Sequence, residues 1–473
     1  MVPGVTDSGL YTDHYELTMA QGYWLDGQAE RHACFDYFFR KAPFQGTYAL
    51  FTGLSDLLDC LTAWHFDDQA CAHLGTLGFD PDFIAFLADF RFQGELFAPP
   101  EGEVVFAGMP VIRVEGNLVE TQLIETLLLN LCNYASLIAT KAARLRQAAG
   151  PRLLLDFGLR RAPGLGGLQA SKAAVLGGMD ATSNVLAAMR YGLVSSGTQA
   201  HAWIQAHDDE LSAFRHYARR YPSQCILLLD TYDTLRSGLP NAIRVAHELA
   251  ADGHRLQGVR LDSGDLAYLS KVTRRRLDEE GLDYVKILAS NQLDEYLIHS
   301  LLEQGAPIDA FGVGTRLVTG QPDAVLDGVY KLCQIDERPC LKLSENPEKI
   351  ILPGRKQVFR WYDGQGRFYA DGIQLADEAP ATRLTHPRDP ERHVDLTGYR
   401  CEPLLRPVMA QGIRLEPVAS AQTIAAYARD RLACLAPEHR RFDNPHPYKV
   451  GISTALLQLR QTCVNAQRAR LVP

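Results

Sequence analysis

The chain has 473 residues, 46% hydrophobic and 22% charged, which is the composition of a folded globular protein and excludes a largely disordered one. Its formal net charge of −8 argues against a nucleic-acid partner, because nucleic-acid phosphates need a basic protein face. The length exceeds what one hydrophobic core usually serves, so we expect two domains or one large barrel with an added layer.

The lack of a visible secretory signal and the cysteine pattern lead us to expect a cytoplasmic protein. The N-terminus shows no basic flank followed by an apolar core, so no secretory signal is visible. The most apolar long segment, Thr121–Thr140, contains Glu125, Asn130 and Asn133, which favours a core helix over a membrane span. The 10 cysteines include no Cys-x-x-Cys pair, which predicts free thiols in a reducing compartment. We therefore expect no membrane partner.

The first 150 residues predict a mixed region of helices and antiparallel strands. Leu10–Leu25 has the spacing of a short helix, and Cys34–Arg40 that of a strand. Proline and glycine interrupt short apolar runs in Glu95–Glu115, as in antiparallel strands joined by turns. Thr121–Gly150 then predicts one long helix or two abutting helices.

From residue 153 the pattern changes to a regular alternation of strands and helices. Helix candidates such as Pro240–Ala251 and Asp294–Gln304 separate the strand candidates. The predicted strands are Leu153–Asp156, Leu193–Ser196, Cys225–Asp230, Gln257–Leu261, Tyr284–Ala289 and Ile308–Val313. This alternation implies a parallel sheet, and about six such units suit a closed barrel.

The last third of the chain leaves this alternation. After Val329–Ile335 we expect β-hairpins over Arg338–Arg360, with turns around Asn346-Pro347 and Pro353-Gly354, and then a surface linker over Asp377–Leu396. One or two strands over Glu402–Leu415 should follow. The chain should end with a helix over Ala421–Leu435 and a final helix from about Ser453.

Polar residues follow the predicted parallel strands at the point where each strand ends. The segments are Asp156–Arg161, Asp230–Asp233, Arg260–Asp265, Ser290-Asn291 and Gly312–Arg316. Because the carboxyl ends of parallel strands meet at one edge, we expect these groups to share a rim. Guanidinium pairs suit a carboxylate or phosphate, and bare glycine backbone allows close approach to an anion.

His201 stands apart from the other histidines of the chain. It follows a Gly-Thr turn at a predicted strand end and enters a helix, and no paired histidine spacing suggests zinc. A nearby aspartate such as Asp233 could orient the imidazole, which could then act as a general base or accept a phosphoryl group. A partly buried histidine bonded to backbone is the alternative.

These segments together resemble the nicotinate phosphoribosyltransferase family from about Tyr11 to about Val450. The matching pieces are YTDHYELTMAQGY, FDYFFRKAPF, LLLDFGLRRAPG with GGMDATSN, GTQAHAW, LLLDTYDT, VRLDSGDL, FGVGTRLVT and NPHPYKV. The resemblance implies an enzyme that joins nicotinate to 5-phosphoribosyl 1-pyrophosphate, giving nicotinate mononucleotide and pyrophosphate. It also implies ATP hydrolysis coupled through a phosphohistidine, a requirement for Mg²⁺ whose ligands it does not identify, and a homodimer with shared active sites.

The fold that the resemblance implies is α/β, with an irregular (β/α) barrel and a mixed α+β sandwich-like domain. We expect residues 1–150 to form the N-terminal α+β domain with connecting helices, and residues 151–335 the catalytic barrel. Residues 336–473 would be a C-terminal segment that packs with the N-terminal domain.

The resemblance also implies roles for individual residues. His201 would be the phosphorylated histidine, Asp233 its orienting partner, and Asp262 would meet the ribose hydroxyls with Arg260 nearby. Phe157 and the partner subunit's Tyr15 would form the walls around the pyridine ring, with Arg160 beside the ring and Asp180 near its substituent. Thr198 would contact the substrate, and the partner subunit's Arg40 would reach the phosphates. Gly312, Gly314 and Thr315 would surround the ribose 5-phosphate.

Other functions stay open at this point. The acceptor could be nicotinamide, because Asp180 could receive an amide N–H, although the Arg160-Arg161 pair favours a carboxylate. A phosphate-binding barrel lyase or isomerase would explain the rim, but Lys172 and Lys286 are poor candidates for its catalytic lysine. A nucleotide-binding sensor without activity is the third alternative.

Overall fold

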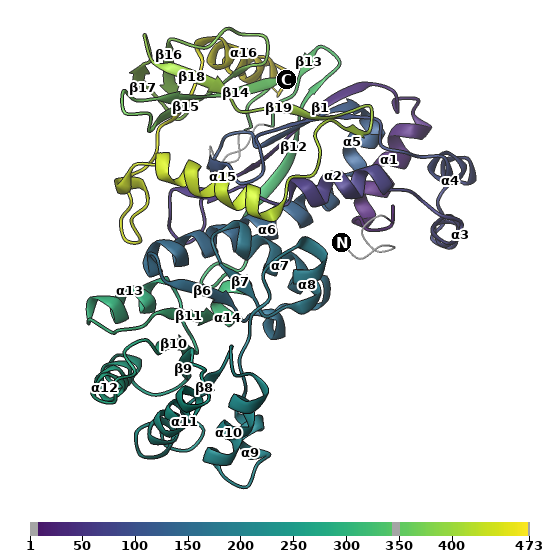
Figure 1. Ribbon diagram of the computed structural model, residues 1–473. Helices are drawn as coiled ribbons and strands as arrows, with labels where there is room; N and C mark the ends of the chain where they lie inside the picture. The colour runs from purple at the N-terminus through teal and green to yellow at the C-terminus, as the bar shows by residue number, and fades with distance from the viewer. Residues whose placement is uncertain (1–7, 343–350, 472–473) are drawn as a thin grey trace. The chain divides into compact units, whose positions relative to one another are not determined.

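The computed structural model describes residues 8–342 and 351–471, which Figure 1 shows coloured along the chain. The chain divides into two compact units: unit 1 comprises Met1–Thr140 and Val325–Pro473, and unit 2 comprises Lys141–Ala324. The sequence-based division placed its boundaries after residues 150 and 335, whereas the units change after Thr140 and Ala324. The expected hairpin turn at Asn346-Pro347 lies outside the described residues.

Unit 1 contains two large sheets and one small one, and most of their strand pairs are antiparallel. The first sheet has the order β13 (Arg338–Pro339), β12 (Gly328–Ile335), β1 (His32–Phe39), β5 (Ile112–Asn117), β3 (Glu95–Ala98), β19 (Arg406–Ala410) and β20 (Ile413–Arg414). The second has the order β17 (Asp389–Asp395), β16 (Arg383–His386), β21 (Val450–Ile452), β15 (Phe368–Leu375), β14 (Lys356–Tyr362) and β18 (Arg400–Pro403). The small sheet pairs β2 (Tyr48–Leu50) with β4 (Val104–Phe106).

Both ends of the chain contribute to the first sheet, where β1 pairs with β12 on one side and with β5 on the other. Figure 1 shows β1 in purple beside β12 in green. The expectation of a surface linker over Asp377–Leu396 was wrong, because β16 and β17 form an antiparallel hairpin there. Four of the charged residues that suggested a linker, Asp389, Glu391, Arg392 and Asp395, belong to β17, an edge strand, where charge opposes further strand pairing.

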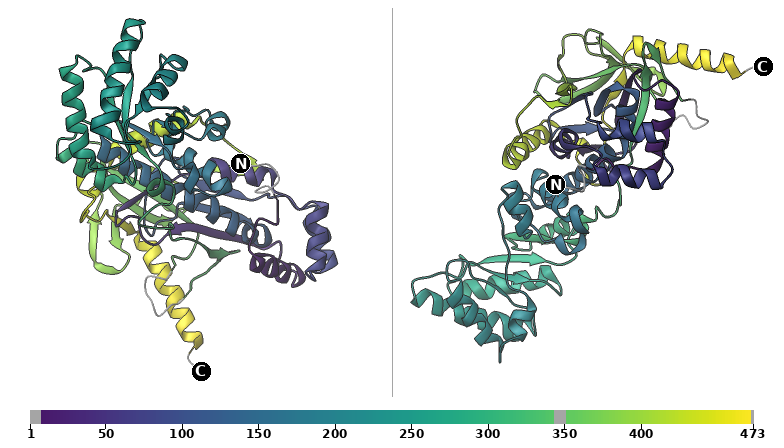
Figure 2. Two further views of the ribbon diagram at one scale, coloured as in Figure 1. Left: turned by 90° about the horizontal axis from the view of Figure 1, so that it is seen from below. Right: turned by 90° about the vertical axis from the view of Figure 1, so that its right-hand side faces the viewer.

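Eight α-helices of the described residues lie in unit 1 or begin there. They are α1 (His14–Leu25), α2 (Leu54–Ala63), α3 (Asp68–Thr76), α4 (Pro81–Ala88), α5 (Leu118–Leu123), α6 (Glu125–Ala149), α15 (Ala421–Cys434) and α16 (Thr454–Leu471), with a 3₁₀ turn at Pro437–His439. α6 crosses the boundary between the units. Figure 2 shows α16 in yellow running outward from the sheets of unit 1.

The two abutting helices expected over Thr121–Gly150 are α5 and α6. A capping box begins α5: the Asn117 side chain accepts from the Glu120 N–H, and the Glu120 carboxylate accepts from the Asn117 N–H. Leu118–Ala149 is long and apolar enough to cross a membrane, but 72% of its most apolar window is buried inside the structure. That burial is typical of a core helix.

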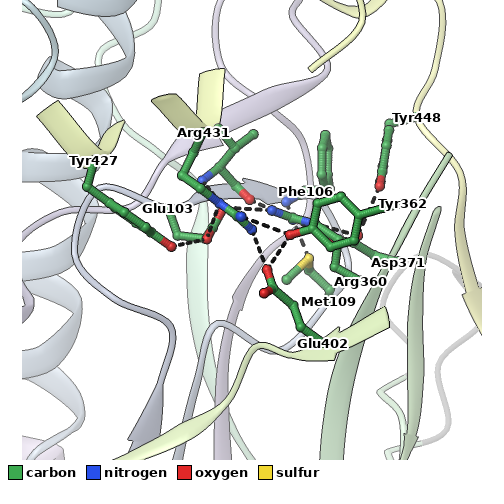
Figure 3. A network of polar contacts seen from close by, with 11 residues as sticks. Glu103, Phe106, Met109, Arg360, Tyr362, Asp371, Glu402, Tyr427, Arg431 and Tyr448 are labelled. Atoms are coloured by element: carbon green, nitrogen blue, oxygen red, sulfur yellow. Dashed lines mark hydrogen bonds and ion pairs between the residues drawn. The ribbon is translucent and has the colours of Figure 1, made fainter. Parts of the chain in front are cut away.

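A buried network of charged side chains ties α15 and the second sheet to the segment before β4 (Figure 3). Arg360 on β14 donates to both carboxylate oxygens of Asp371, at 2.9 and 2.6 Å, and to Glu103 at 2.6 Å. Arg431 on α15 donates to Glu103 and Glu402. Because Arg360, Glu103 and Asp371 are almost completely buried, each charge depends on its partners for compensation.

Unit 2 is built on a parallel sheet with helices attached. The strand order is β7 (Ala181–Thr182), β6 (Leu153–Asp156), β11 (Ala310–Val313), β10 (Lys286–Ser290), β9 (Gly258–Leu261) and β8 (Ile226–Leu228), and all five pairs are parallel. Five of the six expected strands are present within a few residues of their predicted positions. The sixth, Leu193–Ser196, is reduced to one bridge between Ser195 and Thr182, and β7 was not expected.

The described helices of unit 2 lie between its strands along the chain, except that α14 follows the last strand. They are α7 (Gly164–Leu176), α8 (Val185–Tyr191), α9 (His201–Gln205), α10 (Glu210–Arg220), α11 (Leu239–Ala251), α12 (Leu266–Glu279), α13 (Glu295–Glu303) and α14 (Thr315–Val318), with a 3₁₀ turn at Leu159–Arg161 and a π-helical turn at Thr234–Gly238. Leu155, Leu288 and Ala310 pack together with Phe157 on the sheet. The expected α/β class is therefore present. Among the described residues no strand pairing joins β7 to β8, the two outermost strands, so the observed strand pairs do not close the sheet into a barrel.

Replacing Arg360 with methionine should lower the free energy of unfolding by about 3–5 kcal/mol, because Glu103 and Asp371 would keep buried charges without their main partner. Urea denaturation of both proteins measures the change. The matched control is Arg429→Met on α15, whose side chain is 78% exposed and which should change stability by no more than about 0.5 kcal/mol. Equal effects of the two substitutions would contradict the importance of the buried network.

Candidate active site

The polar strand ends of unit 2 meet at the carboxyl edge of the parallel sheet, as the sequence predicted. Asp262 directly follows β9, Ser290 ends β10, and Phe157 directly follows β6. The pairing of β9 with β10, and of β11 with β6, places these positions along one edge. This edge is where open parallel α/β sheets hold their ligands.

The guanidinium group of Arg260 joins its own strand-end segment to Ser290 at the end of β10 and to the loop before His201. Its Nε donates to Ser290 Oγ at 3.0 Å, its Nη1 to Thr198 Oγ1 at 2.8 Å and to the Gln199 carbonyl at 3.2 Å, and its Nη2 to Asp262 Oδ1 at 3.1 Å. Ser290 in turn donates a very short hydrogen bond to the same Asp262 oxygen. Arg260 therefore holds the loop before His201 in register with Asp262 and Ser290.

His201 begins α9 and points its two ring nitrogens toward different groups. Nδ1 lies 3.1 Å from the Thr231 hydroxyl oxygen, and Nε2 lies 3.8 Å from Asp262 Oδ2. The side chain is 41% exposed, so solvent and ligands can reach it. The structure therefore brings His201, Asp262, Arg260 and Thr198 together, four residues that the sequence had singled out.

Asp233, the expected orienting partner of His201, has other contacts in the structure. Its carboxylate caps the π-helical turn Thr234–Gly238 and accepts from the N–H groups of Leu235 and Arg236 at 3.0 and 2.8 Å. Among the described residues no hydrogen bond or ion pair joins Asp233 to His201. The neighbour that the structure shows at Nδ1 is Thr231, and the orienting role of Asp233 stays a prediction.

The Phe157 ring rests against glycine backbone. The Phe157 N–H donates to the Val313 carbonyl at 2.8 Å, and a Cβ atom on Gly312 would lie 2.4 Å from ring atom Cε2. A Cβ on Gly314 would lie 3.1 Å from the Phe157 carbonyl oxygen. The Arg260 guanidinium carbon stands 5.8 Å from the ring centre. Glycine at position 312 is thus what allows the ring to lie at the rim, and Thr315 follows as the first residue of α14.

Asp156 organises the turn that carries Phe157. This fully buried carboxylate accepts from the Gly158 N–H at 2.8 Å, the Ser171 hydroxyl at 2.9 Å and the Thr182 hydroxyl at 2.7 Å. Three donors fix its orientation, which suits a structural role beneath the rim. The following 3₁₀ turn, Leu159–Arg161, leaves Arg160 exposed.

Asp180 lies at the other end of β6 from Phe157. Its carboxylate accepts from the Leu154 N–H at 2.7 Å and pairs with Arg146, and its own N–H donates to the Leu154 carbonyl. Because Leu154 is near the start of the strand and Phe157 follows its end, this position does not support the expected contact with the ring substituent. This position therefore gives no support to the contact between Asp180 and an amide N–H on which part of the nicotinamide alternative was based.

The expected site residues of unit 1, Tyr15 and Arg40, are described within that unit. Tyr15 is in the first turn of α1 and 47% exposed. Arg40 follows β1, and its Nη1 lies 4.0 Å from Asp327 Oδ1. The Tyr15 side chain is therefore exposed, whereas the Arg40 side chain is only 26% exposed.

Next to Tyr15, Glu16 is fully buried. Its Oε2 accepts from Gln122 at 2.5 Å, whereas Oε1 has no hydrogen-bond partner among the described residues. Burial raises the pKa of the Glu16 carboxyl from 4.5 to about 7, and the nearby carboxylates of Glu125 and Asp13 add to the rise. Burial also raises the pKa of the Tyr15 phenol well above its usual value.

Sequence reasoning did not single out Thr231, Ser290 and Asp230 as site residues. They stand in the polar strand-end segments, but the pattern does not show which side chains turn toward the cluster. Asp230 Oδ2 accepts from the Asp262 N–H at 3.1 Å. The two residues after Ser290, Asn291 and Gln292, have positive φ angles of 83° and 41°, a strained backbone of the kind found at functional sites.

Among the described residues, one group of three possible metal ligands lies close together outside this rim: Cys34, Asp36 and Cys333 in unit 1. The ammonium group of Lys356 lies 2.8 Å from Asp36 and also donates to the carbonyls of Leu352 and Gly354. A side-chain cation therefore already neutralises this carboxylate.

A parallel sheet whose carboxyl edge gathers an imidazole, a guanidinium, a carboxylate and an aromatic ring defines an α/β enzyme that acts on a small anionic molecule. Family models match the chain as the nicotinate phosphoribosyltransferase N-terminal domain over residues 10–133, the family itself over 153–366 and the C-terminal domain over 355–460. The chain belongs to the nicotinate phosphoribosyltransferase family. The expected family and the expected enzyme class are confirmed.

Individual relatives agree with this membership. The nicotinate phosphoribosyltransferase of Bacillus subtilis is 43% identical over 94% of this chain and 92% of its own, and the human protein is 37% identical over 95% of both. The crystal structure of the human nicotinic acid phosphoribosyltransferase matches with a TM-score of 0.85 and 35% identity, covering 95% of this chain and 99% of that one.

Gly312→Ala should lower kcat/KM of the phosphoribosyltransferase reaction by about 10²-fold, because the new Cβ forces the Phe157 ring from its place at the rim. Steady-state kinetics with the acceptor base varied measure this. Gly364→Ala, where a Cβ would meet nothing within 4 Å, is the control. Unchanged kinetics in Gly312→Ala would show that the ring does not border the substrate.

Glu16→Gln should flatten the pH dependence of stability. Because the folded-state pKa of Glu16 is about 7 and its ordinary value is 4.5, the folded protein binds the proton more tightly, and stability from this group falls as pH rises from 4.5 to 7. Urea midpoints at pH 5 and pH 7.5 should therefore differ less in Glu16→Gln than in wild type. Glu337→Gln, at an exposed position, should keep the wild-type difference. An unchanged slope in Glu16→Gln would contradict the raised pKa.

Proposed function

We propose that this protein joins nicotinate to 5-phosphoribosyl 1-pyrophosphate and releases nicotinate mononucleotide and pyrophosphate. Family membership supports the reaction. The observation that carries the proposal is the single cluster formed by His201, Asp262, Arg260 and Thr198 beside Phe157. It gathers an imidazole, a carboxylate, a guanidinium and an aromatic wall, which are the groups that this substrate pair requires.

The pyridine ring would lie against Phe157, and its carboxylate would meet Arg260 or Arg160. A guanidinium group favours a carboxylate over a neutral amide because it offers paired charged donors. The resemblance assigns the opposite wall of the ring to the partner subunit's Tyr15 and a phosphate contact to the partner subunit's Arg40. We therefore propose a homodimer, and the exposed phenol of Tyr15 is compatible with it.

The phosphoribosyl group would extend from Asp262 toward the glycine backbone. Asp262 would hold the ribose hydroxyls, and Gly312, Gly314 and Thr315 would hold the 5-phosphate through backbone N–H groups. Loops that follow late strands of an α/β barrel commonly bind phosphate in this way. Gly314 and Thr315 stand at the start of α14, whereas at Gly312 the Phe157 ring lies where a side chain would be.

Breaking the bond between ribose C1 and pyrophosphate develops positive charge on the sugar, as in glycoside cleavage. The Asp262 carboxylate favours that charge, and Arg260 lies beside it at 3.1 Å. Nicotinate is already a nucleophile through its ring nitrogen, so the protein has to position it rather than deprotonate it. His201 is therefore free for another task.

A Mg²⁺ ion fits the carboxylates of this rim. Asp230 Oδ1 is buried without a hydrogen-bond partner among the described residues, and carboxylate oxygens are the ligands that Mg²⁺ prefers. Asp230 and Asp262 would hold the ion. When bound, Mg²⁺ would neutralise charge on the departing pyrophosphate.

His201 would couple the reaction to ATP hydrolysis by accepting a phosphoryl group. A phosphoryl group on a side chain adds a charge of about −1.5 to −2. We propose that this charge, set next to Asp262 and Arg260, tightens the hold on 5-phosphoribosyl 1-pyrophosphate through Mg²⁺.

Three features of the protein as a whole complete the proposal. We propose that the sheet of unit 2 is an incomplete barrel, because Gln199 Nε2 reaches the β8 residue Ile226 across the open side at 3.5 Å.

We propose the domain division given by the resemblance, with a barrel between two terminal parts. We also propose a cytoplasmic location, which the ten free cysteines support.

His201→Ala should retain slow formation of nicotinate mononucleotide but no longer couple it to ATP hydrolysis, because the phosphoryl acceptor is gone. The measurement is the ratio of ADP to nicotinate mononucleotide formed by the purified enzyme with all substrates and Mg²⁺. His299→Ala, on the exposed face of α13, should keep the wild-type ratio. A wild-type ratio in His201→Ala would exclude the coupling role.

A further inference from the structure

We propose that the ion pair between Arg316 and Asp294 positions two neighbouring loops of the rim, and that it thereby fixes the distance between the groups that hold the two ends of the phosphoribosyl donor. One loop joins β10 to α13, and the other joins β11 to α14. The inference rests on the proposed function, which places the ribose at Asp262 and the 5-phosphate at Gly314 and Thr315. Arg316 and Asp294 are positioning residues, because neither is placed against the substrate.

The two loops leave the sheet from paired positions. Ser290 and Gly312 are partners in the parallel ladder of β10 and β11. Asp294 and Arg316 each stand four residues further along the chain (290 to 294 and 312 to 316). Arg316 Nη1 lies 3.2 Å from Asp294 Oδ2. The ladder therefore sets the spacing of the loops where they begin, and the ion pair ties them together beyond the last ladder pair.

The loop between β10 and α13 is strained and is held at both ends. The two residues after Ser290 have φ angles of 83° and 41°, in the left-handed region that residues other than glycine rarely adopt. Such a backbone persists only where the surrounding structure fixes it. Arg260 holds the loop at Ser290, and Arg316 holds it at Asp294. Loss of the ion pair would free one of these two ends.

Asp294 is a fixed partner for Arg316. Its Oδ1 accepts from the Leu297 N–H at 2.8 Å and caps α13, while its Oδ2 faces the guanidinium group. The next residue, Glu295, is fully buried and pairs with two basic side chains of α6. Because the first turn of α13 is anchored in this way, the ion pair brings Arg316 and its loop to a defined place.

The ion pair also compensates charge near the loop that is proposed to hold the 5-phosphate. The Asp294 side chain is only 15% exposed, so its negative charge is weakly screened by solvent. Without Arg316, which directly follows Thr315, this carboxylate would oppose a phosphate at the loop. Arg316 Nε is buried without a hydrogen-bond partner among the described residues, which costs free energy. Stability alone therefore does not account for the pair.

The test measures KM for 5-phosphoribosyl 1-pyrophosphate and for nicotinate separately, in the full-length enzyme with saturating ATP and Mg²⁺. Arg316→Met removes the cation, and Asp294→Asn keeps an oxygen that can cap α13 but removes the anion. We expect each substitution to raise KM for 5-phosphoribosyl 1-pyrophosphate about tenfold, with KM for nicotinate and kcat within about twofold of wild type. Arg316→Lys keeps the positive charge and should recover most of the affinity.

Two further variants serve as controls. The double variant, Arg316→Met with Asp294→Asn, should bind 5-phosphoribosyl 1-pyrophosphate no more weakly than Arg316→Met alone, because the two residues act through one contact. Arg275→Met is the matched control. Arg275 also faces a carboxylate, that of Glu279 on the same helix α12, but its side chain is 66% exposed, and both KM values should stay at the wild-type level.

Three results would overturn the inference while nicotinate mononucleotide is still formed. They are an equal rise of both KM values, losses that multiply in the double variant, and an unchanged KM for 5-phosphoribosyl 1-pyrophosphate in both single variants. A wild-type protein that forms no nicotinate mononucleotide from these substrates would contradict the proposed function, and the inference with it.

Discussion

The hydrogen bonds of the Arg260 guanidinium are the interaction on which the site depends. They reach Thr198 in the loop before His201, Asp262 after β9 and Ser290 at the end of β10. Each segment belongs to a different crossover of the parallel sheet, so the backbone ladder alone does not set the positions of their side chains. The charge of the guanidinium and its planar fork of donors do so, because each donor fixes one acceptor in a defined direction.

The remaining parts of the site follow from how the parallel sheet places its strand ends. Asp156 accepts from three donors beneath the turn that carries Phe157, and Gly312 leaves room for the ring. Asp230 holds the backbone of Asp262. Unit 1 has its own buried charges around Arg360, so each unit has a polar network that fixes part of its fold.

Much of the fold was predictable because buried parallel strands are short apolar runs separated by amphipathic helices. Five of the six expected strands of unit 2 are present, as are the abutting helices α5 and α6. The strand β7 was missed because it has two residues, too few for a pattern. The hairpin β16–β17 was mistaken for a linker because an edge strand can be as charged as a loop. In the site, sequence indicated the strand ends but not which way each side chain points, which is why Thr231 was missed.

A crystal structure of the protein with bound nicotinate mononucleotide tests most directly the claim that these strand ends form one active site. The account predicts the pyridine ring against Phe157, the ribose hydroxyls at Asp262 and the phosphate at the backbone of Gly312–Thr315, with Arg260 still bonded to Thr198 and Ser290. A nucleotide bound away from Asp262 and Phe157, with the Arg260 cluster unchanged and vacant, would contradict it.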